Sequence, residues 1–189
     1  MKKMIAFVLL LAVGGLFLAA AQTTQKPVGF KKLQEFLPKI DLDGFRRLKP
    51  GGSTSSAMGM STSEAVVEYE QPMKENLKEG EEPPPQVSFT VKIQDMVGMP
   101  YAMMPYAWMQ EFENESEDGY EKTVMVLGKY KGTEEGRTGE SKSVKTTFGV
   151  ANRYIVEVEV EHSDDGKLLA DVVAAIDLAK LEKLTSEAK

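Results

Sequence analysis

Methionine is the residue type whose density and spacing in this chain could do chemistry. Five methionines fall within one stretch of fourteen residues, which also holds three aromatic side chains. Thioether sulfur is a soft ligand that suits Cu(I). One alternative is therefore a Cu(I)-binding protein that uses the segment 96–109, with Met96, Met99 and Met103 as its ligands.

A second interpretation of the same stretch is an apolar contact surface, and this is the one we favour. Methionine adapts its shape to irregular gaps in a core or to the surface of a partner. Met104, Ala107 and Trp108 recur about one turn apart, so the spacing predicts a helix over residues 99–112. Pro100 suits its first position, whereas Pro105 in its interior should kink or break it. The predicted interaction surface comprises Met99, Tyr101, Met103, Met104, Tyr106, Trp108 and Met109.

A single histidine, His162, is the candidate for acid–base catalysis. Asp164 and Asp165 follow it closely, but a catalytic triad is defined by geometry and not by proximity in sequence. The chain has no Gly-x-Ser-x-Gly elbow, and Ser163 is better explained as a helix cap. We predict no catalytic residue and keep a hydrolase that uses His162 as a further alternative.

The amino-acid composition and residue spacing do not support other kinds of metal or cofactor site. The chain has no cysteine, which excludes a thiolate nucleophile, a thiolate zinc site and a redox dithiol. The acidic stretch 113–118 lacks the ligand spacing and central glycine of a calcium loop. Further carboxylates alternate with apolar residues, as on the solvated face of a strand; they are Glu68, Glu70, Glu157, Glu159 and Glu161. We predict no cofactor and no resident metal.

The first 21 residues have the pattern of a secretory signal peptide. Lys2 and Lys3 precede an apolar run that ends at the small residues of positions 19–21. The run is shorter than the roughly 20 residues of a spanning helix, and no second apolar run follows it. We expect export to the periplasm or the extracellular space, a flexible N-terminus over 22–29, a single domain over 30–189, and no transmembrane segment after processing.

The acidic balance of the chain argues against polyanionic partners. The full sequence carries a formal net charge of −6. Loss of Lys2 and Lys3 with the signal leaves 21 basic minus 29 acidic residues, which gives −8. Phosphate contacts dominate nucleic-acid affinity, so we predict no nucleic-acid partner.

The first half of the chain is expected to hold one helix and two strands. Apolar residues at helical spacing predict a short helix over 30–37 that Pro38 ends. A short extended piece follows at 45–48, and the glycines and hydroxyls of 50–56 are typical of a loop. Alternating apolar residues predict strands over 63–70 and 87–94, paired as a long hairpin around a polar connector at 71–86.

The second half is expected to hold three strands and a closing helical region. The strands are predicted over 123–127, 143–150 and 153–161, after an acidic loop at 113–119. The last two are separated by Ala151 and Asn152 alone, which favours a tight antiparallel hairpin, although Ala-Asn is not the favoured Asn-Gly sequence. A single bent strand is the alternative. A cap formed from Ser163 and the two following acids should begin a helix, and Asp177 should cap a final helical segment.

This order predicts an α+β fold, with an antiparallel sheet of about five to six strands packed by two to three helices. With Leu37-Pro38 followed by Gly44-Phe45, the chain resembles the PsbP-like fold over most of residues 30–185. The resemblance implies an α-β-α sandwich and a non-catalytic module that docks onto proteins or binds small apolar ligands. We therefore expect an exported binding module whose partner is an envelope protein or a small apolar ligand.

Overall fold

One antiparallel sheet dominates the molecule. The computed structural model describes residues 26–57, 60–72 and 85–187; the predicted signal peptide and most of the 71–86 connector lie outside these ranges. The strands are β1 (Arg46–Arg47), β2 (Gly51–Ala57), β3 (Met60–Glu70), β4 (Ser88–Asp95), β5 (Glu113–Ser116), β6 (Gly119–Val126), β7 (Tyr130–Arg137), β8 (Ser143–Val150) and β9 (Tyr154–Glu161). The helices are α2 (Phe30–Leu33), α3 (Met104–Trp108), α4 (Gly166–Ala174) and α5 (Leu178–Glu187), with 3-10 helices η1 (Gln34–Phe36) and η2 (Pro100–Met103).

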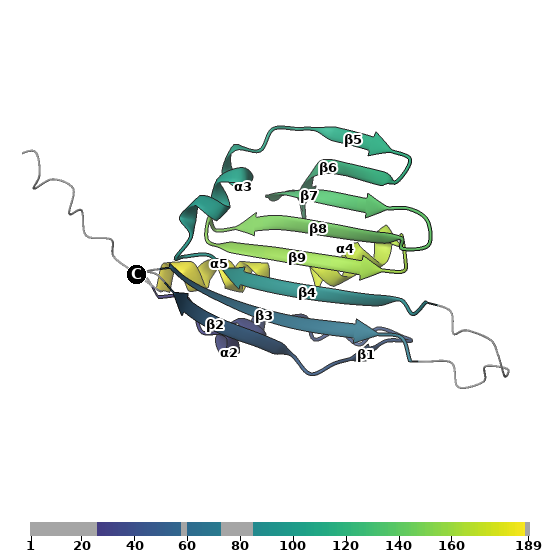
Figure 1. Cartoon of the computed structure of the whole chain (residues 1–189). Coiled ribbons are helices and arrows are strands. Elements are labelled where there is room, and N and C mark those ends of the chain that lie inside the picture. Colours follow the sequence, from purple (N-terminus) through teal and green to yellow (C-terminus); the bar gives the residue numbers. More distant parts are fainter. Residues whose placement is uncertain (1–25, 58–59, 73–84, 188–189) are drawn as a thin grey trace, which may run out of the picture.

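The sheet is assembled from two parts that meet at one central pair of strands. Its order is β1-β3-β4-β9-β8-β7-β6-β5, and β2 also pairs with β3 (Figure 1). Strands β5 to β9 form a meander in which each strand pairs with the next in sequence. The long-range β4–β9 pairing, with Phe89 opposite Val160, joins this meander to the N-terminal strands.

The core lies between one face of the sheet and the helices α2, η1, α4 and α5. Alternate residues of β4 and β9 point into it and are fully buried, among them Phe89, Ile93 and Val158. Leu169 of α4 and Leu181 of α5 pack against them, and both helices pass behind the sheet in Figure 1. Burial of each such side chain contributes about 1.5–3 kcal/mol. The opposite face of the sheet carries the polar residues that alternate with the core.

The predicted α-β-α sandwich of five to six strands is wrong. The described part of the chain forms a nine-stranded sheet with only small helices, so the fold is mainly β. Strands β2, β5 and β7 account for the difference. Each has a composition typical of a loop: glycine and serine in β2, exposed polar residues in β5, and glycine with charged residues in β7.

Close packing by the neighbouring strands explains how β7 forms a strand despite two glycines. Gly136 lies opposite Tyr120 of β6, and Gly132 lies opposite Phe148 of β8. A Cβ atom at Gly136 would lie 2.2 Å from the Tyr120 ring, so this ring occupies the space that the glycine leaves, which is a known way to stabilise glycine in a sheet. A Cβ atom at Gly132 would lie 2.3 Å from the Thr147 carbonyl oxygen and 2.6 Å from the Phe148 Cβ, so β8 packs closely on this glycine.

The remaining two unexpected strands depend on pairing with a neighbour. The stretch 50–56, predicted as a loop, is mostly β2, and all seven residues of β2 pair with β3. Hydroxyl pairs cross this ladder, with Thr54 Oγ1 2.9 Å from Ser63 Oγ and Ser56 Oγ 2.8 Å from Ser61 Oγ. The predicted acidic loop over 113–119 is mostly β5, which pairs with β6.

Several other expectations from the sequence are confirmed. Strands β3 and β4 form the predicted hairpin, and β8 and β9 pair as the predicted antiparallel hairpin. The connection between β8 and β9 has three residues, Ala151, Asn152 and Arg153, and not the expected two, because Val150 pairs with Tyr154. Ala151 and Asn152 both have positive φ, 52° and 50°.

Helix α4 begins two residues later than predicted, because its cap is Asp165 and not Ser163. The Asp165 carboxylate accepts hydrogen bonds from the backbone N–H groups of Lys167 and Leu168. None of the helices in the described part has the length and apolar character needed to cross a membrane.

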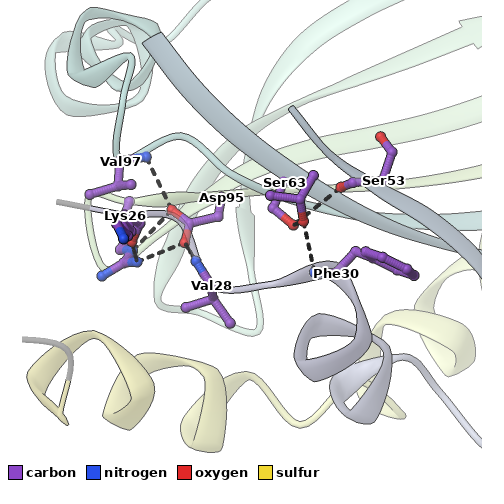
Figure 2. A network of polar contacts seen from close by, with 9 residues as sticks. Lys26, Val28, Phe30, Ser53, Ser63, Asp95 and Val97 are labelled. Atoms are coloured by element: carbon purple, nitrogen blue, oxygen red, sulfur yellow. Dashed lines mark hydrogen bonds and ion pairs between the residues drawn. The ribbon is translucent and has the colours of Figure 1, made fainter. Parts of the chain in front are cut away.

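A buried ion pair ties the N-terminal segment to the sheet. Asp95 ends β4 and Arg153 precedes β9, and both side chains are almost fully buried. Figure 2 shows the Asp95 carboxylate accepting hydrogen bonds from Val28 N at 2.8 Å and Val97 N at 3.0 Å. Arg153 donates to the same carboxylate at 3.0 and 2.7 Å, and also to the carbonyl oxygen of Lys26 at 3.5 Å. Residues 26–28 are thus anchored at the end of the predicted flexible segment.

Candidate interaction surface

The methionine-rich segment is folded as two short helices and not as one long helix. The predicted helix over 99–112 is wrong, because a 3-10 turn occupies Pro100–Met103 and α3 spans only Met104–Trp108. Pro105 lies in the first turn of α3, where a missing backbone N–H leaves no helical hydrogen bond unmade. The helix ends at Met109, whose ψ of 124° turns the chain towards β5.

Two residues of this segment anchor it to the sheet. Met103 is only 1% exposed, and Tyr106 is half-buried. Both lie over Gly149 of β8: a Cβ atom there would be 3.0 Å from the Tyr106 Cβ and 3.1 Å from the Met103 Cε. Because Phe148 and Val150 point into the core, Gly149 points to the opposite face. The segment therefore covers one end of the face of the sheet that the other helices leave open.

The end of the segment is held by polar contacts to β6 and β7. Lys131 Nζ donates to the carbonyl oxygen of Met109 at 3.1 Å, and Thr123 Oγ1 donates to that of Gln110 at 2.9 Å. Thr123 N also donates to the carbonyl oxygen of Phe112 at 2.9 Å. The segment is therefore fixed both through Met103 and Tyr106 and through residues 109–112.

The electrostatic setting of Tyr106 agrees with its position over the sheet. Burial raises the pKa of its phenol, and the negative charges of Glu157 and Glu135 raise it further. Both carboxylates form ion pairs on that face, Glu157 with Lys92 at 2.7 Å and Glu135 with Lys145 at 3.0 Å. Tyr106 therefore stays a neutral packing residue near physiological pH.

Three large side chains of the segment face solvent. Trp108 is 79% exposed, Tyr101 56% and Met104 55%. Met104 and Trp108 are four residues apart on α3, so they lie on the same side of the helix. Two exposed apolar residues outside the predicted set are grouped with them: Met60, whose sulfur accepts a hydrogen bond from the Tyr101 hydroxyl at 3.6 Å, and Phe112, which follows Trp108 by four residues and is 40% exposed. We call Met60, Tyr101, Met104, Trp108 and Phe112 the η2–α3 surface.

The other predicted members are not exposed in the same way. Met99 and Met109 are half-buried, and Met103 is buried. Met60 was missed because it belongs to β3, about forty residues earlier, and only the fold brings it to Tyr101. The alternation of β3 does place Met60 on the same face as Thr62 and Glu64, away from the core.

The Cu(I) alternative stays a prediction. Of its three proposed ligands, Met96 and Met99 are half-buried and joined by a backbone hydrogen bond of 2.8 Å, whereas Met103 packs against Gly149. Among residues 26–57, 60–72 and 85–187, no three His, Cys, Asp or Glu side chains gather as metal ligands.

His162 is not assembled with the predicted catalytic companions. It follows β9 with a positive φ of 55°, and its buried Nδ1 has no hydrogen-bond partner in the described part of the chain. Asp165 caps α4, and Asp164 pairs with Lys142 at 3.3 Å. The two carboxylates therefore have structural contacts of their own.

Two shallow pockets flank Tyr120 at the far end of the sheet. One, of about 330 Å³, is lined by residues of β5, β6 and β7, including Asn114, Glu121 and Arg137. The other, of about 250 Å³, includes Lys142 and Asp164. Neither is lined by His162 or by the η2–α3 surface. Burial and the hydrogen bond to Glu134 raise the pKa of Tyr120 to about 12, so its phenol stays neutral there.

No family model matches this chain, and no curated protein or solved structure shows a significant match to it. The PsbP-like resemblance therefore stays a prediction, apart from the sandwich architecture that the nine-stranded sheet contradicts.

Proposed function

We propose that this protein is an exported, non-catalytic binding module of the periplasm or cell envelope that contacts a partner protein through its η2–α3 surface. The observation that carries the proposal is the exposure of Tyr101, Met104 and Trp108 on a segment that Met103 and Tyr106 anchor to the sheet. Met103 and Tyr106 hold the segment on the sheet, whereas Met104 and Trp108 are mostly exposed to solvent.

The chemistry of the exposed residues suits a protein contact. Tryptophan and tyrosine are enriched among the residues that dominate binding energy at protein interfaces. Methionine adapts to the shape of a partner because its side chain is unbranched and polarisable. Covering these groups removes apolar area from water and contributes about 25 cal/mol for each Å².

A protein partner fits this surface better than a small apolar ligand. A small ligand is normally held in a concave site that buries most of its area. The two pockets described above lie around Tyr120, away from the exposed aromatic residues. In the η2–α3 surface, by contrast, Tyr101, Met104 and Trp108 are each more than half exposed.

The proposal is tested by placing a photo-cross-linking amino acid at position 104 or 108 in the exporting host. Ala170, an exposed residue of α4, is the matched control position. We expect both surface positions to cross-link one partner of the same mass and position 170 to miss it. Equal cross-linking from all three positions would contradict the proposal.

A loss-of-binding variant completes the test. Y101A/M104A/W108A removes the three exposed side chains and leaves Met103 and Tyr106 in place. We expect it to keep the far-ultraviolet circular dichroism of the wild type and to lose at least about tenfold in affinity for the cross-linked partner, as hot-spot truncations do. Unchanged affinity in a folded triple variant would exclude this surface as the contact.

A further inference from the structure

Strand β2 forms a border of the sheet that the described chain leaves unpaired. One side of β2 pairs along its whole length with β3, and no other described strand lies on its opposite side (Figure 1). All seven residues of β2 are exposed. The N-terminal helical segment contacts β2 at two places: Gln34 Nε2 donates to the carbonyl oxygens of Pro50 and Gly51, and Phe30 N donates to Thr54 Oγ1 at 3.1 Å. The second contact uses the Thr54 side chain and not a backbone group of β2.

This border lacks the features that usually prevent strands from pairing between molecules. Charged residues, proline, bulges and short length protect most edge strands. Strand β2 has the sequence Gly-Gly-Ser-Thr-Ser-Ser-Ala, with no charge and no proline. The other border of the sheet is β5, which has only four residues and carries Glu113 and Glu115. The β1 part of the first border is protected by Arg46, Arg47 and Pro50.

We propose that β2 pairs antiparallel with the β2 strand of a second copy of this chain, which joins the two sheets into one. Pairing centred on Thr54 places Ser53 opposite Ser55 of the second copy and Gly51 opposite its Ala57. All seven residues then take part, and the contact is closed by a two-fold axis, the commonest symmetry of protein dimers.

Charge favours pairing of β2 with β2 of the second copy over pairing of β2 with β5 of the second copy. The predicted processed chain carries a net charge of −8, so most contacts between two copies bring like charges together. The β2–β2 seam contains no charge, whereas β2–β5 pairing would bring the two glutamates of β5 to the seam. Small serine, glycine and alanine side chains also let two backbones approach without a steric conflict.

The first test is the mass of the processed chain by sedimentation, with a charged variant at each border. S53K/S55K places lysines opposite each other across the proposed seam, and like charges in opposed positions weaken strand pairing. N114K/S116K on β5 is the matched control. We expect twice the monomer mass for the wild type and the β5 variant, and a dimer dissociation constant raised at least about tenfold for the β2 variant.

The second test uses the absence of cysteine in the chain, because any introduced cysteine is then the only thiol. A disulfide can form only when the two Cα atoms lie within about 7 Å of each other. Residues directly opposite each other on paired strands meet this limit, whereas diagonally placed residues generally do not. We expect S53C mixed with S55C to form a covalent dimer faster than either variant alone.

A monomeric wild type at its highest soluble concentration would overturn the proposal, and so would a dimer that both lysine variants retain. Equal cross-linking of all cysteine mixtures would overturn the register. The Y101A/M104A/W108A variant separates the β2–β2 dimer from the proposed partner binding by the η2–α3 surface. We expect this variant to remain a dimer whether or not it binds a partner.

Discussion

At the scale of single residues, the Asp95–Arg153 pair is the most consequential polar contact in the core. The carboxylate is fully buried and accepts two hydrogen bonds from Arg153 and two from backbone N–H groups, those of Val28 and Val97. It therefore joins three parts of the chain: the N-terminal segment, the end of β4 and the start of β9. A buried charge is tolerated only where it is paired and hydrogen-bonded in this way.

Replacing Asp95 by Asn should destabilise the fold strongly, because Arg153 would keep a buried charge without a counterion. We expect a loss of about 3–5 kcal/mol in the free energy of unfolding, measured in urea at neutral pH. The matched control is D171N, which breaks the exposed Lys167–Asp171 pair and should change stability by less than about 0.5 kcal/mol. D95L/R153M, which removes both charges, should recover much of the loss. A loss below about 1 kcal/mol for D95N would show that the pair is not the anchor described here.

Glu159 gives the fold a pH dependence. It lies on the polar face of β9 opposite Lys145, whose Nζ pairs instead with Glu135. Burial raises the pKa of Glu159, Lys145 lowers it, and Glu161 and Glu157 raise it again. A carboxyl with a raised pKa in the folded state favours folding when it is protonated. That contribution is complete below the unfolded pKa of 4.5 and is lost as the pH rises through the folded pKa.

E159Q, which mimics the protonated form, should therefore be more stable than the wild type at pH 7. We expect a gain of about 0.5 kcal/mol, because solvent screens a partly exposed carboxylate. The gain should shrink as the pH falls through the raised pKa of folded Glu159, and it should be absent below about 4.5. E161Q on the same strand is the control and should show a smaller effect. A loss of stability for E159Q at pH 7, measured by urea unfolding, would give Glu159 a favourable ionic contact that the structure does not show.

At the scale of elements, the sequence predicts the strands that have two different faces. In β3, β4, β8 and β9 buried and partly exposed residues alternate almost without exception, and all four were expected near their observed positions. The alternation arises because one face packs on the helices and the other does not. The sequence also indicates where the helix caps lie, although which of Ser163, Asp164 and Asp165 is the N-cap of α4 depends on the local backbone.

The missed strands lack this asymmetry, since their stability comes from residues elsewhere in the chain. Gly136 packs against the Tyr120 ring, sixteen residues earlier, and no local pattern shows that pairing. The candidate surface illustrates the same limit. Met103 and Met104 are adjacent and chemically identical, yet one is buried against Gly149 and the other is 55% exposed. The sequence identified the right segment but could not show which of its side chains face solvent.

At the scale of the whole molecule, the β4–β9 pairing is the contact on which both parts of the fold depend. It joins residues about seventy positions apart, and the Asp95–Arg153 pair lies at its end. The meander from β5 to β9 is built from neighbouring strands, but its core-facing residues on β8 and β9 need β4 and the helices to be covered. We therefore infer that the sheet unfolds from its borders inward and that the central strands open only with the whole molecule.

Amide hydrogen exchange measured at several protein concentrations tests this picture and the proposed dimer together. We expect the slowest exchange in β4 and β9, at a rate set by global unfolding, and fast exchange in the short border strand β5. Exchange in β2 should slow as the concentration rises, because pairing with a second copy protects its free N–H groups, while β5 should not respond. Exchange in β4 as fast as in β5 would contradict the central role of the β4–β9 pairing. Slow exchange in β2 at every concentration would mean that the chain itself protects the N–H groups of β2. This result would contradict the β2–β2 dimer, because no unpaired strand would be left for a second copy.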